Sequence, residues 1–273
     1  MNCLKPKIPA ETNNPDLIKF LLVRFIFKKS NYDFLMTFKP FFLIIYLISF
    51  LFSDVVNEGS FIKTGEYSIL EIEGRKIYLH PDLEIHPKKQ DVIDLLRVKL
   101  FDVKRMLPET SYEKIKETPI WVDNGDSGCP GACYHPSRLW LVENDFNPDK
   151  AESIQIGSPE TFLEWTKQQP FMILHELAHA YHHQFLGYGN KEINEAYENA
   201  LASGSYEKVL HWDGNERRHY GLNNNQEYFA ESSEAYFGVN DFYPFVRGEL
   251  KVHDLEIYLL MGKLWNPVDE EIE

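Results

Sequence analysis

One short motif limits most strongly what this chain can fold into: His175-Glu-Leu-Ala-His179, in the middle of an otherwise mainly apolar stretch, residues 170–187. A proline at the start and a glycine at the end of this stretch predict one buried helix. On such a helix His175 and His179 lie one turn apart on the same face, so both imidazoles can reach one metal ion. Glu176 stands where a carboxylate can take a proton from water at that metal without ligating it.

The motif also permits a structural interpretation, in which both histidines are satisfied core residues and Glu176 lies at the surface. A third protein ligand would separate the two interpretations, because a catalytic zinc needs one besides His175 and His179. His183 follows on the same face but lies about 6 Å further along the helix axis, too far to share one ion easily. Phe185 occupies the place where a longer version of the motif carries a third histidine. The third ligand is therefore expected from another segment.

Residues 223–238 predict a second helix, opened by asparagine caps and closed by a glycine. Glu227, Glu231 and Glu234 recur at spacings of four and three, so they share one face of it. Apolar neighbours indicate that this helix is buried, where unpaired carboxylates are costly and a metal with its histidines would satisfy them. Spacing alone leaves Glu227 and Glu231 as rival third ligands. Asn224-x-x-Glu227 also fits a helix-start pattern in which Glu227 only folds back on the cap.

The first motif and the later run His219-Tyr-Gly-Leu-Asn-Asn-Asn-Gln-Glu-Tyr-Phe-Ala-Glu231 together resemble the catalytic domain of the anthrax lethal factor family. In that family a Tyr-Gly pair precedes an Asn-x-x-Glu-Phe-Phe-Ala-Glu segment. The similarity covers residues 170–240 and extends to secreted lethal-factor-like metallopeptidases of microbes. Tyr228 departs from it, because the family usually carries phenylalanine there. Toxin delivery and the toxin's specificity for kinase kinases are not carried over to this chain.

The resemblance implies roles for six residues of this sequence. It implies three zinc ligands: His175, His179 and Glu227. It makes Glu176 the general base and Glu231 a neighbouring carboxylate that orients a ligand histidine. It places Tyr220 where a phenol donates a hydrogen bond to the developing oxyanion. The alternative role for Tyr220 is packing, because the chain has 15 tyrosines.

The remaining segments predict an α+β protein with a zincin-like architecture. In it a small N-terminal mixed sheet lies over the active-site helix and a mainly helical C-terminal part follows. Strands are predicted at residues 68–73, 76–79, 119–122 and 138–142, with a glycine-rich loop at residues 123–137. Helices are predicted at residues 91–107, 190–202 and 254–265. Residues 139–142 are the candidate for an edge strand that pairs with an extended substrate, and an interior strand without a substrate role is the alternative.

Residues 40–52 form an uncharged apolar run that is short for a membrane span and has the length of a signal-peptide core. Met36 stands just ahead of this run, so translation from Met36 would give a short positive start and cleavage near Ser53. We therefore divide the chain into an N-terminal extension with a signal peptide or signal anchor, residues 1–53, and a catalytic domain, residues 54–273. The catalytic domain is expected to be secreted, or tethered to a membrane and extracytoplasmic if residues 40–52 are retained.

Charge and cysteine content argue against some partners. Residues 1–53 carry seven basic and three acidic side chains, whereas the remainder carries 21 basic and 39 acidic ones, a formal charge of −18. Such an acidic body disfavours nucleic acid and anionic membrane surfaces as partners. Cys129 and Cys133 predict a small disulfide-closed loop in an oxidising compartment, because two thiolates are too few for a structural zinc.

Together these features predict a zinc-dependent metalloendopeptidase that hydrolyses peptide bonds in a peptide or protein substrate, with Zn²⁺ as cofactor. Glu176 would act as the general base and Tyr220 would stabilise the oxyanion. Three alternatives stay open: a zinc amidase that acts on a non-protein substrate, a metal-stabilised binding protein without catalysis, and a membrane-tethered interaction module if residues 40–52 are retained as an anchor. The sequence contains no feature that indicates an oligomeric state.

Overall fold

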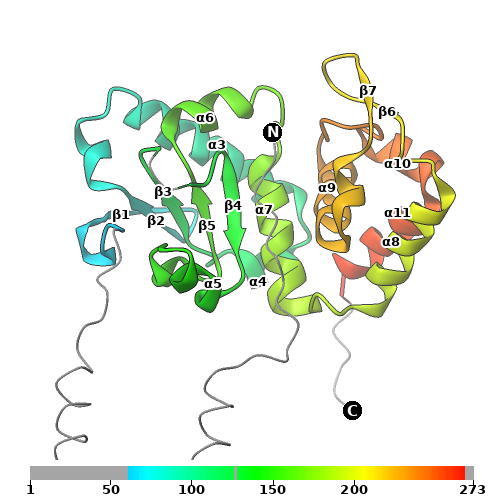
Figure 1. Cartoon of the computed structure of the whole chain (residues 1–273), viewed down its shortest axis with the longest axis horizontal. Helices are drawn as coiled ribbons and strands as arrows, with labels where there is room; N and C mark the ends of the chain where they lie inside the picture. Colours follow the sequence, from blue (N-terminus) through cyan, green and yellow to red (C-terminus); the bar gives the residue numbers. More distant parts are fainter. Residues whose placement is uncertain (1–60, 126–127, 268–273) are drawn as a thin grey trace, which may run out of the picture. The chain divides into compact units, whose positions relative to one another are not determined.

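The computed structural model describes residues 61–125 and 128–267, which form an α+β fold as the sequence predicts. The predicted N-terminal extension, residues 1–53, lies outside the described residues, and the apolar run of residues 40–52 lies outside them with it. Figure 1 shows a sheet, a helix beside its edge and a further group of helices beyond that helix. Within the described ranges, no helix combines the length and the apolarity that crossing a bilayer demands.

A mixed sheet precedes the histidine helix in the chain. Its strands are β1 (Ser68–Ile72), β2 (Arg75–Leu79), β3 (Ile120–Val122), β4 (Ala132–His135) and β5 (Ser153–Ile156). They lie in the order β1-β2-β3-β5-β4, with β2, β3 and β5 parallel and the two edge strands antiparallel to their neighbours. The β1–β2 turn has positive φ at Glu73 and Gly74, 51° and 78°, as a two-residue hairpin turn requires.

One face of this sheet forms the main core. Ile77, Ile120 and Ile154 lie opposite one another in register on β2, β3 and β5, and all three are fully buried. They belong to one hydrophobic cluster with Leu96 and Leu174 from two helices that cover the face. Burying each such side chain contributes about 1.5–3 kcal/mol, so this face fixes the position of the helices on the sheet.

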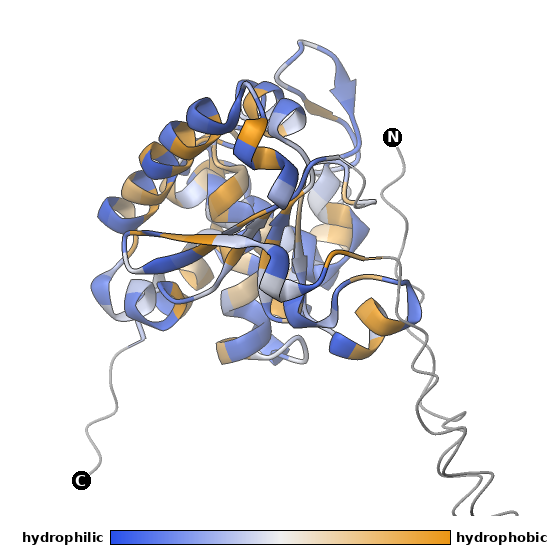
Figure 2. Cartoon of the chain, turned by 90° about the vertical axis from the view of Figure 1, so that its left-hand side faces the viewer, coloured by the Kyte–Doolittle hydropathy of each residue, from blue (hydrophilic) through white to orange (hydrophobic). Residues whose placement is uncertain are grey.

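Nine α-helices occur among the described residues. They are α3 (Lys89–Met106), α4 (Glu109–Ile115), α5 (Arg138–Glu143), α6 (Pro159–Trp165), α7 (Met172–Tyr181), α8 (Lys191–Ser203), α9 (Asn225–Phe237), α10 (Arg247–His253) and α11 (Leu255–Leu264). Helix α7 contacts β4 on one side and α9 on the other (Figure 1). Figure 2 shows hydrophobic and hydrophilic residues alternating along the helices, as expected where one face of each is buried.

Helix α7 carries the histidine motif and is shorter than the predicted helix. Its α-helical part continues as a π-helical turn, His182–Leu186, and Gly187 ends the segment with a φ of 75°. Every residue of α7 except His179 is buried, because the helix lies between the sheet and α9. A π-helical turn inside a helix frequently marks a functional site. Here it directly follows the turn that carries the two histidines.

Helix α9 begins and ends where the sequence predicts. The Asn224 side chain caps it by accepting hydrogen bonds from the first-turn N–H groups of Gln226 and Glu227, at 2.9 and 2.8 Å. Gly238 ends the helix against the ring of Phe171, the residue that caps α7. A Cβ at Gly238 would lie 2.6 Å from that ring, so glycine permits the close approach of α7 and α9.

The strand predicted at residues 138–142 is wrong. These residues form α5, because the Ser137 side chain accepts a hydrogen bond from a first-turn N–H and so caps a helix. Leu141 is buried while Leu139 is 68 % exposed, so the apolar run presents one helical face to the core. The predicted substrate-pairing strand, residues 139–142, is therefore wrong as well. The edge strand beside α7 is β4, which lies inside the predicted loop.

Three further strands, β5, β6 and β7, were not expected from the sequence. Strand β5 lies centrally between β3 and β4. After the histidine helix, β6 (Val209–Leu210) and β7 (Glu216–Arg217) form a small antiparallel hairpin, so the C-terminal part is mainly but not wholly helical. The helices predicted at residues 91–107, 190–202 and 254–265 are present as α3, α8 and α11.

Candidate metal centre

Three side chains from α7 and α9 converge on one point. His175 Nε2 lies 3.1 Å from His179 Nε2 and 3.1 Å from Glu227 Oε2, and His179 Nε2 lies 3.4 Å from the same Glu227 oxygen. The two histidines meet because they are one helical turn apart. Glu227 meets them because it stands in the first turn of α9, which packs against α7. The three predicted zinc ligands are thus brought together.

The chemistry of this cluster fits a metal ion. The His175 ring places Nδ1 only 2.7 Å from Glu234 Oε1, so Nδ1 donates its proton in a hydrogen bond to that carboxylate, and Nε2 is the ring nitrogen that faces Glu227 and His179. Burial opposes a charge on His175, yet its hydrogen bonds with Glu227 and Glu234 raise the pKa of this ring well above its ordinary value. The cluster therefore attracts positive charge. Two imidazole nitrogens and one carboxylate form a donor set that catalytic zinc uses.

Glu227 serves the cluster rather than the helix cap. Its backbone N–H donates a hydrogen bond to the Asn224 side chain, but its carboxylate faces the two histidines. Burial raises the pKa of this carboxyl group, and the charges of His179 and His175 overcome that effect and hold the pKa below its ordinary value. Glu231 was the rival ligand from sequence. It lies on the other side of the His175 ring, where its Oε1 is 3.5 Å from Nδ1.

Glu234, for which we predicted no separate role, makes the shortest contact with a predicted ligand histidine. Its Oε1 lies 2.7 Å from His175 Nδ1, closer than the predicted orienting residue Glu231 at 3.5 Å. The same oxygen accepts a hydrogen bond from the Gln169 side chain, 3.2 Å, just ahead of α7. The signal was present in the sequence as the shared face of the three glutamates. The contact of that face with His175 could not be predicted from spacing, because it depends on how α9 packs against α7.

Glu176 lies within the protein beside the sheet edge. Its Oε2 accepts a hydrogen bond from the backbone N–H of Tyr134 on β4, 2.7 Å. Burial raises the pKa of Glu176 above its ordinary value, while the neighbouring His179 and His175 lower it. A carboxylate with a raised pKa next to a metal cluster is suited to accept and return a proton. The Tyr134 N–H is a contact that the sequence did not indicate.

Tyr220 begins a 3-10 turn, Tyr220–Asn223, that packs against α9. Tyr220 itself is 38 % exposed, while the preceding His219 is buried and lies 3.9 Å from Glu231 Oε2 through its Nδ1. The Gly221 N–H donates to the same His219 nitrogen, 2.9 Å, and fixes the turn. The segment of Tyr220 is thus anchored beside the acidic face of α9. Its donor role stays a prediction.

A disulfide joins Cys129 to Cys133, whose Cα atoms are 6.4 Å apart. Cys133 lies in β4 opposite Gln155 of β5, and the Cys129 sulfur lies 3.6 Å from the Gln155 carbonyl oxygen. The disulfide therefore closes the loop that leads into the edge strand beside α7.

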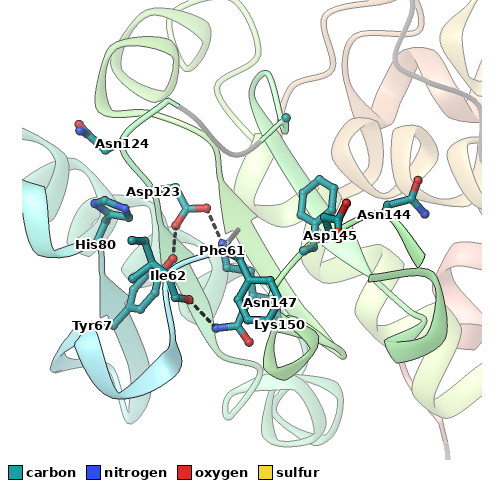
Figure 3. Close-up of a pocket in the computed structure, with 12 residues that line it drawn as sticks. Phe61, Ile62, Tyr67, His80, Asp123, Asn124, Asn144, Asp145, Asn147 and Lys150 are labelled. Carbon is teal, nitrogen blue, oxygen red and sulfur yellow. Dashed lines mark hydrogen bonds and ion pairs between the residues drawn. The ribbon is translucent and has the colours of Figure 1, made fainter. Parts of the chain in front are cut away.

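A second group of polar residues surrounds a cavity of about 340 Å³ (Figure 3). Asp123 accepts hydrogen bonds from the Tyr67 hydroxyl, 2.8 Å, and from Gln155 and Lys150. The Asp123 and Lys150 side chains are only 4 % and 5 % exposed. Gln155 alternates with the core residue Ile154, so this network lies on the sheet face that points away from the main core. Because its charges satisfy one another, we interpret it as a structural network.

Comparisons of the chain with protein-family models, with curated proteins and with solved structures found no match. The functional proposal consequently depends on the geometry of the cluster and on the two motifs that build it.

Proposed function

We propose that this chain is a zinc-dependent metalloendopeptidase of the lethal factor-like type, with a zincin-like catalytic domain. The observation that carries the proposal is the convergence of His175, His179 and Glu227 beside the buried carboxylate of Glu176. A metal-stabilised binding protein without catalysis would need the three ligands. It would not need a buried carboxylate with a raised pKa that stands next to them without binding the metal. The proposal includes secretion of the domain.

His175, His179 and Glu227 would hold the zinc ion through Nε2, Nε2 and Oε2. Zinc bound there supplies Lewis-acid chemistry, which polarises a carbonyl group and makes water more acidic. The carboxylates Glu234 and Glu231 hold His175 in the tautomer that keeps its Nε2 lone pair for the metal.

Glu176 accepts a proton from the attacking water and returns it to the amine nitrogen of the leaving group. Its position supports this role, since it follows His175 directly on α7 and points to β4 rather than into the ligand cluster. Tyr220 donates a hydrogen bond to the carbonyl oxygen as negative charge develops there. Removing one such donor from an enzyme typically costs about 10²–10³ in kcat.

The edge strand β4 is the element of this chain best suited to hold an extended peptide. It is the last strand of the sheet, and its partner β5 occupies only one of its two edges. No strand among the described residues pairs with its outer edge, so apart from the Tyr134 N–H, which donates to Glu176, that edge can form main-chain hydrogen bonds with a peptide laid alongside it. Because the Tyr134 N–H reaches Glu176, a peptide on this edge would lie next to the proposed base. This replaces residues 139–142 as the pairing segment.

The experiment that tests the function compares wild-type protein with Glu176→Gln and Glu227→Gln on a mixed peptide library, with bound zinc measured in each. We expect Glu176→Gln to keep zinc and fold but lose cleavage, because only the proton acceptor is removed. We expect Glu227→Gln to lose zinc. Cleavage by Glu176→Gln at the wild-type rate would refute the role of Glu176 as general base. A zinc-loaded wild type that cleaves no peptide would point to an amidase on another substrate or to a binding protein.

A further inference from the structure

Tyr188 stands where the two ligand-bearing helices meet. It directly follows Gly187, whose positive φ turns the chain after the π-helical segment. Its backbone carbonyl accepts a hydrogen bond, 3.1 Å, from the side chain of Asn225 in the first turn of α9. Asn225 is two residues ahead of the ligand Glu227. The end of the histidine segment and the start of the Glu227 helix are therefore joined at Tyr188.

The ring of Tyr188 is held by two neighbours on the π-helical turn. It packs edge-on against His182 and tilted against His183, each at 5.0 Å between ring centres. His182 is fully buried against Phe229 of α9, so the tyrosine ring packs on a buried surface. The direction of the phenol is thus set by packing and not by a hydrogen bond of its own.

The hydroxyl of Tyr188 is uncommitted. Within residues 61–125 and 128–267, it has no hydrogen-bond partner. The neighbouring Tyr134 hydroxyl differs, because it contacts His183 Nδ1 at 3.0 Å and accepts from Gln184 at 2.9 Å. A half-buried phenol without a protein partner can still donate one hydrogen bond to a bound molecule.

Tyr188 lies beside the segments that carry the reacting groups. Its carbonyl is bonded to Asn225, next to Glu227 on α9, and its ring partner His183 contacts the Tyr134 hydroxyl, while the Tyr134 backbone N–H donates to Glu176. Burial raises the pKa of the Tyr188 phenol, and the charges of Tyr134, Glu227 and Glu176 raise it further, well above its ordinary value. The negative charges of the ligand carboxylate and of the proposed base therefore both act on the phenol. It stays protonated throughout the pH range in which a peptidase works, so it acts as a donor.

We propose that Tyr188 is a catalytic hydrogen-bond donor of this site, which donates its hydroxyl proton to the carbonyl oxygen of a bound peptide as negative charge develops. This inference rests on the proposed peptidase function. It gives the metal centre a phenol on the segment that joins α7 to α9, in addition to Tyr220 on the turn ahead of α9. A donor that strengthens its bond as charge develops lowers the barrier rather than tightening substrate binding.

The test uses Tyr188→Phe in the full zinc-loaded protein, with a peptide that the wild type cleaves. Phenylalanine keeps the ring packing on His182 and His183 and removes only the hydroxyl. Tyr78→Phe is the matched control, since Tyr78 lies on β2, stacked at 4.1 Å on Trp121 on the far face of the sheet. Each variant is checked for zinc content and melting temperature, so that loss of fold is seen separately.

We expect Tyr188→Phe to lower kcat by about 100-fold with little change in KM, while Tyr78→Phe matches the wild type. A phosphinic peptide, which mimics the tetrahedral state, should bind Tyr188→Phe more weakly by a similar factor in calorimetry. Wild-type kcat and wild-type phosphinic-peptide affinity in Tyr188→Phe would overturn the assignment and leave the peptidase proposal intact. A zinc-loaded wild type without cleavage would overturn both. A lower melting temperature with unchanged phosphinic-peptide affinity would make Tyr188 structural.

Discussion

His135 is expected to make the stability of this protein fall in acid, and His135→Gln should remove that effect. His135 ends β4, is 5 % exposed and lies 2.6 Å through Nε2 from the Gln155 side-chain oxygen. The Gln155 amide donates to Asp123, so its oxygen must accept from His135 Nε2–H. A second proton would have to sit on Nδ1 of a ring packed against Trp140 and Phe146. The folded protein therefore resists charging His135.

The size of the effect follows from the two pKa values. Burial lowers the pKa of His135 from 6.5 to about 4, with Lys150 lowering it further and Gln155 and Asp123 opposing. Because the folded pKa is below the unfolded one, the unfolded chain takes up the proton first as pH falls. The contribution to stability is complete above pH 6.5 and is lost towards pH 4. The loss amounts to about 2 kcal/mol at pH 5 and about 3 kcal/mol at pH 4.

The assay is urea unfolding of wild type and His135→Gln between pH 7.5 and pH 4.5. Glutamine cannot titrate, so the difference in unfolding free energy should shift by about 2.5 kcal/mol in favour of the variant at the acid end. Other titrating groups are shared by both proteins and cancel in the difference. A difference that stays constant over this range would show that His135 takes up the proton inside the fold, and would contradict a neutral His135.

Two further outcomes follow from buried carboxylates. Lys150→Met leaves Asp123 buried without its cation and should cost about 3–5 kcal/mol of unfolding free energy, part of which returns in Lys150→Met combined with Asp123→Asn. An equal loss in the single and the double variant would contradict this. Glu234→Gln should weaken zinc affinity by about tenfold in a chelator titration, and Glu231→Gln by less, because Glu234 is nearer to His175. Equal effects of the two variants would refute this ranking.

The sequence predicted the parts of the site that depend on local spacing. His175 and His179 face one point because a helix repeats every 3.6 residues, and Asn224 marks where α9 begins. The choice between Glu227 and Glu231 was open from spacing, since both share one face. The structure brings Glu227 to the Nε2 side of His175 and Glu231 to the Nδ1 side. That division depends on the rotation of α9 against α7, which is a tertiary property.

The errors on the sheet have a similar origin. The apolar run at residues 138–142 reads equally as a strand or as a short helix, and the cap at Ser137 was the signal that decided it. Strand β5 was missed because its polar residues Ser153 and Gln155 are buried with hydrogen bonds, so alternation did not mark it as central. The polar side chain of Gln155 on β5 belongs to the Asp123 network, and no local sequence pattern indicates that network.

The contacts of His175 link positions that are far apart along the chain. Its partners Glu227 and Glu234 follow it by 52 and 59 residues. An ion held by His175, His179 and Glu227 would therefore act as a reversible cross-link between the middle and the C-terminal part of the protein. It binds only the folded chain, so ion at 1,000 times its Kd would add about 4 kcal/mol to the unfolding free energy. Resistance to heat would then follow the free metal concentration around the protein.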